Sequence, residues 1–163
     1  MSFHSRGVTY INHFNSQFAG EVGLVSVGLG KDFRRYSIGG MYGVVPTEVS
    51  GGVLIETITL RQTYDFFHWQ RLAAYGGLNI FHVLGIQYRT EDYGEVPDRY
   101  YPVGSIRGLL NLGLATTFNK RESRIIYVEA GLNDIAITNL INNAEVINVA
   151  DEFSLALGFK QKF

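Results

Sequence analysis

The last stretch of the chain, residues 153–163, alternates in a way that restricts the possible folds. Large apolar residues hold the odd positions except Gln161, and Ser, Ala, Gly or Lys hold the even positions. Successive side chains of a strand point to opposite faces, so this pattern predicts a strand with one apolar and one small face. A water-soluble sheet normally carries charge along its second face, whereas here that face stays small until Lys160. The pattern favours a strand whose apolar face meets lipid and whose small face fills a narrow barrel.

Similar apolar runs recur along the chain and are separated by polar turns. They predict eight strands, at 7–14, 20–30, 34–45, 53–66, 70–83, 105–118, 123–134 and 152–163. Short connections at 31–33, 67–69 and 119–122 alternate with longer ones, notably 84–104 and 135–151. Short turns at one end and long loops at the other are typical of outer-membrane barrels. An even number of strands places both termini at the short-turn end.

Charged residues are missing from most of the predicted strands. No Asp, Glu, Lys or Arg occurs in 22–30, 36–45, 72–83 or 153–159, and 106–118 contains Arg107 alone. A barrel in water would need charges on the solvated face of each strand. The sequence therefore predicts an all-β fold, an eight-stranded antiparallel up-and-down transmembrane β-barrel, formed as a single domain over residues 1–163.

Five of the strands resolve into two faces, while the register of 20–30 and 70–83 stays open. The predicted lipid face comprises Tyr36, Ile38, Tyr42, Val44, Ile58, Leu60, Tyr64, Ile106, Leu110, Leu112, Leu114, Ile126, Val128, Leu132, Leu155, Leu157 and Phe159. Aromatic residues gather near the short turns, as in the girdle at a membrane boundary: Phe33, Tyr36, Tyr64, Phe66, Phe67, Trp69, Phe118 and Phe163. Aromatic clusters beside turns also occur in soluble cores, which is the alternative interpretation.

Composition narrows the classes of function. A net charge of -1 provides no basic field, so we expect no nucleic-acid partner. The absence of cysteine excludes disulfides, thiolate zinc sites and a cysteine nucleophile. The histidines, His4, His13, His68 and His82, are scattered without metal-ligand spacing, so we expect no metal, and no motif indicates a cofactor. No apolar leader follows Met1, so we expect this sequence to be the mature form of an exported protein.

The pattern from about residue 20 to the terminal Phe163 resembles the small eight-stranded bacterial outer-membrane barrels. The resemblance implies location in the bacterial outer membrane, with membrane lipid and lipopolysaccharide as surroundings. In those families a C-terminal aromatic residue on an alternating strand is read by the barrel-insertion machinery, which implies that Phe163 is an insertion signal. The resemblance is architectural and implies no activity.

On the predicted register, polar residues face the barrel interior. They comprise Thr57, Thr59, Arg61, Thr63, Asp65, Arg107, Asn111, Thr117, Tyr127, Glu129, Asn133 and Lys160. Eight strands leave an interior just wide enough for side chains to fill, and a buried charge needs an opposite partner. We therefore predict an interior polar network of Arg61, Arg107, Glu129 and Lys160, with Glu129 as a partner for Lys160. A proton or ion path is the functional alternative.

The long connections are the places where binding is expected. Residues 84–104 combine charge with tyrosines, and the candidates for contacting an extracellular partner or lipopolysaccharide sugars are Tyr88, Arg89, Tyr93, Arg99, Tyr100 and Tyr101. The alternative is a solvated loop of ordinary composition. Residues 135–151 are unusually apolar, so that this stretch either continues the barrel strands beyond the membrane or docks a partner.

The sequence favours a non-enzymatic barrel that stabilises the envelope or presents its loops for recognition, with no catalytic residue assigned. One alternative is a lipid A-modifying hydrolase, because the outer-membrane lipid A deacylases share this size and strand count. Those enzymes use a His-x-Ser pair and a carboxylate, whereas residues 131–136 contain neither His nor Ser, and Glu152 alone could match the carboxylate. The other alternative is a soluble lipocalin-like barrel that binds an apolar ligand.

Overall fold

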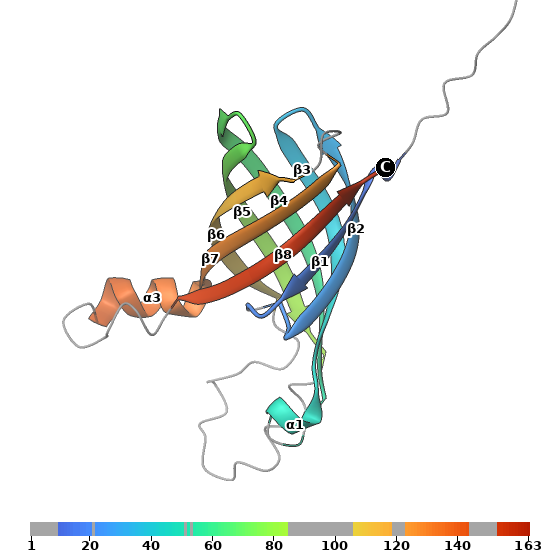
Figure 1. Ribbon diagram of the computed structural model, residues 1–163. Helices are drawn as coiled ribbons and strands as arrows, with labels where there is room; N and C mark the ends of the chain where they lie inside the picture. The colour runs from blue at the N-terminus through green and yellow to red at the C-terminus, as the bar shows by residue number, and fades with distance from the viewer. Residues whose placement is uncertain are drawn as a thin grey trace, which may run out of the picture.

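The computed structural model describes residues 10–20, 22–50, 52, 54–84, 106–118, 123–143 and 153–163. Within these residues the chain forms a closed antiparallel barrel in which each strand pairs with its neighbours in sequence and β8 pairs with β1 (Figure 1). The strands are β1 His13–Phe18, β2 Val25–Phe33, β3 Tyr36–Val45, β4 Ile55–Trp69, β5 Leu72–Val83, β6 Ile106–Thr117, β7 Arg124–Asn133 and β8 Ser154–Lys162. The prediction of an all-β, eight-stranded, up-and-down antiparallel barrel is confirmed.

The first predicted strand, 7–14, is misplaced, because residues 10–12 are not in a strand and β1 runs from His13 to Phe18. Residues 7–9 lie outside the described residues. The inward-facing residues of β1, His13, Asn15 and Gln17, are polar yet buried, so they do not give the apolar signal by which a strand is normally identified. The other seven predicted strands overlap the observed ones, with ends displaced by at most five residues, at the start of β2.

Two hairpins are closed by turns of two residues each. The turn between β2 and β3 is Arg34 and Arg35, and the turn between β4 and β5 is Gln70 and Arg71. The first residue of each turn has positive φ, 57° at Arg34 and 53° at Gln70, as tight hairpins require. The turns predicted at 31–33 and 67–69 therefore lie inside strands.

The longer connections lie at the opposite end of the barrel, where helices α1 (Thr47–Ser50) and α3 (Asp134–Asn143) are found (Figure 1). Helix α3 was not predicted. It begins directly after β7, where the Asn133 Oδ1 atom accepts a hydrogen bond from the backbone N–H of Ala136 at 2.7 Å and caps the helix. Among the described residues, no helix is long and apolar enough to cross a membrane, a result that does not bear on crossing by strands.

The two faces of the barrel wall differ in polarity. Large apolar side chains are exposed on the outside of every strand, and the register left open in the sequence is resolved by exposed Val25, Val27 and Leu29 on β2 and by Leu78 and Ile80 on β5. The buried inward-facing residues are largely polar: His13, Asn15, Gln17, Ser26, Thr57, Thr59, Arg61, Thr63, Asn79, Asn111 and Glu129. The apolar part of the interior is a small cluster of Val22, Phe81 and Leu109 at the long-connection end.

Glycines on the inner face make room for tyrosine rings in the narrow lumen. A Cβ atom added at Gly158 of β8 would overlap the ring of Tyr127, and one at Gly113 of β6 would overlap the ring of Tyr75. This close approach explains why the inner face of the last strand is small.

Candidate functional site

An arginine and a glutamate meet across the lumen at mid-height of the barrel. Arg61 comes from β4 and Glu129 from β7, two strands that are not neighbours in the sheet. The Arg61 Nη1 atom donates to Glu129 Oε1 at 2.8 Å and Nη2 donates to Oε2 at 2.7 Å. Both residues are nearly inaccessible, with 6% of Arg61 and 5% of Glu129 exposed. The two parallel hydrogen bonds form the strongest geometry available to this pair.

Four neutral side chains surround the ion pair. Tyr75 Oη donates to Glu129 Oε2 at 2.9 Å, and Asn111 Nδ2 donates to the same oxygen at 2.8 Å. Gln17 Oε1 accepts bonds of 3.3 Å from Arg61 Nη1 and from Tyr127 Oη. The guanidinium carbon lies 5.0 Å from the centre of the Tyr127 ring. We call these six residues the central cluster: Gln17, Arg61, Tyr75, Asn111, Tyr127 and Glu129.

The central cluster is electrically balanced and well bonded. Both oxygens of the Glu129 carboxylate accept hydrogen bonds, and the positive charge of Arg61 is directly opposed. In an eight-stranded barrel, side chains of this size fill the interior. The arrangement therefore acts as a plug that joins opposite walls. The sequence interpretation missed Gln17 because β1 was misplaced, and Tyr75 because the register of its strand was left open.

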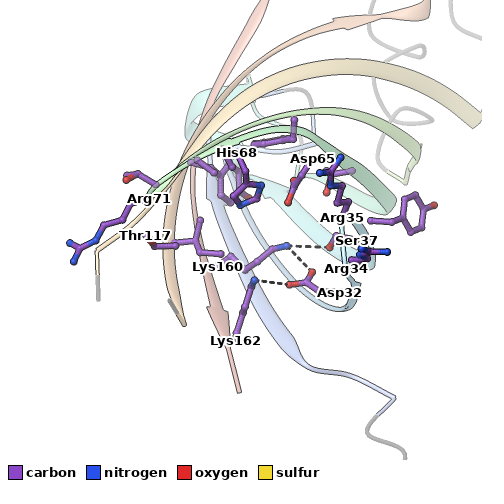
Figure 2. Close-up of a pocket in the computed structure, with 18 of the residues that line it drawn as sticks. Asp32, Arg34, Arg35, Ser37, Asp65, His68, Arg71, Thr117, Lys160 and Lys162 are labelled. Carbon is purple, nitrogen blue, oxygen red and sulfur yellow. Dashed lines mark hydrogen bonds and ion pairs between the residues drawn. The ribbon is translucent and has the colours of Figure 1, made fainter. Parts of the chain in front are cut away.

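Lys160 has a different partner from the one predicted. Its Nζ atom lies 3.0 Å from Asp32 Oδ1 and donates to Ser37 Oγ at 3.2 Å, near the short-turn end of the barrel (Figure 2). Glu129 instead pairs in the sheet with Ala156, four residues before Lys160, so the two groups lie at different heights. The expectation that Glu129 is the partner of Lys160 is wrong.

Asp32 collects two further basic side chains. Lys162 Nζ lies 3.5 Å from Asp32 Oδ2, and His13 Nδ1 lies 3.1 Å from Oδ1. These contacts tie together β1, β2 and β8, the strands at which the barrel closes. Asp32 was predicted to lie in a turn because a charged residue normally indicates solvent.

Arg107 does not join the central cluster. Its Nε atom donates to Asp134 Oδ1 at 2.8 Å, and its Nη2 atom lies 2.7 Å from the same oxygen, at the long-connection end. Partial burial acts to raise the pKa of the Asp134 carboxyl, but the hydrogen bond and charge of Arg107 lower it more, so that this pKa lies below its usual range. The pair fixes the start of α3 to β6.

A cavity of about 170 Å³ opens at the short-turn end, and we call it the short-turn vestibule. Arg61, Tyr75 and Tyr127 of the central cluster lie at its inner limit, and the turn residues Arg34 and Arg71 lie at its rim (Figure 2). The walls include Asp32, Ser37, Thr63, Asp65, Thr117 and Lys160. The lining of the vestibule combines charged and polar side chains with apolar surface, and three residues of the central cluster form part of it.

The remaining predicted residues fall into two groups. Phe163 donates its backbone N–H to Asn12 O at 3.0 Å while 70% of the residue is exposed on the outside. The six loop candidates lie outside the described residues: Tyr88, Arg89, Tyr93, Arg99, Tyr100 and Tyr101. Within the described part of the chain, no group of three or more His, Cys, Asp or Glu residues is placed to hold a metal ion.

These observations define the protein by its architecture, as a closed up-and-down β-barrel with a polar, plugged interior. Comparison of the chain with known protein families, with curated proteins and with solved structures finds no match.

Proposed function

We propose that this protein is an integral barrel of the bacterial outer membrane, non-enzymatic, that stabilises the envelope or presents its long connections for binding. The observation that carries the proposal is the inverted polarity of the wall, which is apolar outside and polar inside. In water this arrangement would expose a continuous apolar surface, whereas in a bilayer it places each face in a matching environment.

The outer wall provides an apolar band around the barrel. Exposed fractions on it reach 66% for Leu112 on β6 and 70% for Leu155 on β8. Except for the six-residue β1, the strands have nine to fifteen residues, and about 9–11 tilted residues span a bilayer core. The exposed aromatic residues at the short-turn end fit a girdle at the lipid boundary: Phe33, Tyr64, Phe66, Phe67, Trp69, Phe118 and Phe163.

The plugged interior argues against conduction. The ion pair of Arg61 and Glu129 joins opposite walls, and its polar neighbours occupy the lumen around it. An ion would have to displace a bidentate charge pair that is almost fully buried. We therefore favour the structural or loop-presenting role over the proton or ion path.

The soluble lipocalin-like alternative is disfavoured by the same interior. An apolar ligand needs an apolar cavity, whereas the described lumen contains a buried ion pair and a vestibule lined by several charged side chains. The deacylase-like alternative also gains no support. Asn133 and Asp134 lie in the stretch where that resemblance would require His and Ser, and they serve to cap α3 and to pair with Arg107.

The partners proposed for the barrel follow from its setting. Membrane lipid contacts the apolar band, lipopolysaccharide surrounds the long-connection end, and the insertion machinery reads the exposed Phe163. An extracellular or envelope protein is the further candidate for the long connections. The short turns then face the periplasm.

The proposal is tested by folding the purified chain into phosphatidylcholine vesicles. We expect a folded barrel that migrates differently on SDS gels with and without boiling, resists extraction by alkaline carbonate and gives no conductance steps in planar bilayers. A chain that stays monodisperse and folded in detergent-free buffer contradicts the membrane assignment. Regular conductance steps contradict the plug.

A further inference from the structure

The lining of the short-turn vestibule carries an excess of positive charge. It includes two acidic residues, Asp32 and Asp65, and six cationic ones, namely Arg34, Arg35, Arg61, Arg71, Lys160 and Lys162. Arg61 is directly opposed by Glu129, while Lys160 and Lys162 share the single carboxylate of Asp32. The excess therefore comes from this lysine pair and from the three arginines at the rim.

The three rim arginines, Arg34, Arg35 and Arg71, are all exposed and form no ion pair with other described residues. They belong to the two short turns, which both open on the same mouth of the barrel (Figure 2). Among the described lining residues, Asp65 is the acid left to offset them.

The opposite end of the barrel has a different balance. The charged residues described there are Glu48, Glu56 and Asp134, together with Arg107. Among the described residues, the excess of positive charge therefore lies at the short-turn mouth. A charged recess with low-dielectric walls concentrates oppositely charged ligands.

The vestibule also offers polar groups besides its charges. The described lining includes the polar residues Ser37, Thr63, Thr116 and Thr117. Ser37 Oγ accepts a hydrogen bond from Lys160 Nζ at 3.2 Å. The volume of about 170 Å³ is more than ten times the roughly 10–15 Å³ that one water molecule requires.

We propose that the short-turn vestibule is a binding site for a phosphoryl group. A phosphate presents several charged oxygens in a tetrahedral arrangement, and the vestibule is lined by cationic residues from two turns and from β8. Arginine forks bind phosphate oxygens in pairs, and lysine adds a point charge. A carboxylate has two oxygens and one charge, so it engages fewer of these groups.

The phosphoryl group can come from a lipid headgroup at the membrane surface or from a soluble phosphate ester, because both present the same chemistry. The inference requires the folded barrel and does not require its membrane location. A protein that binds in detergent but fails to enter vesicles would keep this inference and overturn the proposed function.

The test uses the full chain folded in a nonionic detergent and titrated with glycerol 1-phosphate. Calorimetry measures binding, and Trp69, the single tryptophan, reports beside the Gln70 and Arg71 turn. We expect saturable binding at one site that weakens as salt is raised, with acetate at least tenfold weaker. The double variant Arg34→Gln/Arg35→Gln should weaken binding at least tenfold.

The matched control is Lys31→Gln/Arg124→Gln, which removes two positive charges at the same end from residues outside the vestibule lining. We expect this control to change the affinity less than threefold, and gel mobility before boiling verifies that each variant is folded. Absence of saturable binding to the unmodified protein overturns the proposal. Equal weakening by the control and the rim variant also overturns it, because a general field would then explain the effect.

The source of the phosphoryl group is resolved by repeating the titration in nanodiscs. Loss of glycerol 1-phosphate binding in phosphatidylglycerol nanodiscs, with retention in phosphatidylcholine nanodiscs, supports a lipid headgroup as the occupant. Equal affinity in both supports a soluble phosphate ester. Arg71→Gln should weaken binding in whichever setting binding is seen, and an unchanged affinity in that variant contradicts the role of the second turn.

Discussion

Removal of the Glu129 carboxylate should destabilise the barrel strongly. In Glu129→Ala the residue Arg61, only 6% exposed, keeps Gln17 Oε1 at 3.3 Å and Tyr75 Oη at 3.5 Å as its remaining hydrogen-bond partners. Tyr75 and Asn111 also lose the oxygen to which they donate. Breaking a buried pair by removing one partner costs about 3–5 kcal/mol of unfolding free energy, which is a large share of the usual ~5–15 kcal/mol total.

The loss of unfolding free energy in Glu129→Ala should come from the unpaired charge of Arg61 rather than from the missing side-chain atoms of Glu129. The double variant Arg61→Met/Glu129→Leu removes both charges, so its loss should be at least about 2 kcal/mol smaller than that of Glu129→Ala. Glu48→Ala, which removes an exposed acid in α1, serves as the control and should stay within about 0.5 kcal/mol of the parent.

The assay is reversible urea unfolding in phosphatidylcholine vesicles, followed by Trp69 fluorescence and by circular dichroism. A stabilising role of the ion pair is contradicted if Glu129→Ala and Glu48→Ala have the same unfolding free energy. It is also contradicted if the double variant loses as much stability as the single variants Arg61→Met and Glu129→Leu lose together.

Three other changes test separate parts of the structure. Leu112→Arg places a charge on the outer wall and should cost about 2–4 kcal/mol in vesicle unfolding if the residue lies near the bilayer midplane, whereas a loss below about 0.5 kcal/mol contradicts lipid contact. Gly158→Ala forces a Cβ against the ring of Tyr127 and should cost about 1–3 kcal/mol, and unchanged stability would show that the ring has room to move. The lowered pKa of Asp134 means that its pair with Arg107 stabilises the start of α3 above the ordinary carboxyl pKa of about 4, and that this support is lost as pH falls through the lower folded value. Hydrogen exchange at the first turn of α3 should therefore quicken, after correction for intrinsic rates, as pH falls below about 4, and Asp134→Asn should abolish that dependence.

The general architecture was predictable because the wall of this barrel repeats with period two. Leu110, Leu112 and Leu114 alternate with residues that point inward, and the same pattern closes the chain at residues 153–163. Charge-free strands and alternating connection lengths then indicated a closed up-and-down barrel. These patterns can be recognised within each segment, without knowledge of which strands pair.

The failures arose where polar residues face inward or where partners are distant in sequence. Asp32 was interpreted as part of a turn, although it lies inside the barrel beside Lys160, 128 positions later. The pairing of β1 with β8 brings these residues together. The residue pattern within a single strand does not reveal which strands pair. Helix α3 could have been predicted from Asn133 and Asp134, which are residues that cap helices, before an apolar run. Because the apolar stretch is long, it was interpreted as a strand continuation or a docking segment instead.

The most direct test of the membrane assignment compares the environment of a wall residue with that of a residue in α1. Since the chain has no cysteine, Leu112→Cys on β6 and Glu48→Cys in α1 can each carry a single spin label. In phosphatidylcholine vesicles we expect the label at position 112 to be accessible to oxygen dissolved in the lipid and shielded from a water-soluble nickel chelate. The label at position 48 should be accessible to the nickel chelate. Ready access of the nickel chelate to position 112 would contradict the proposal that the apolar wall faces lipid.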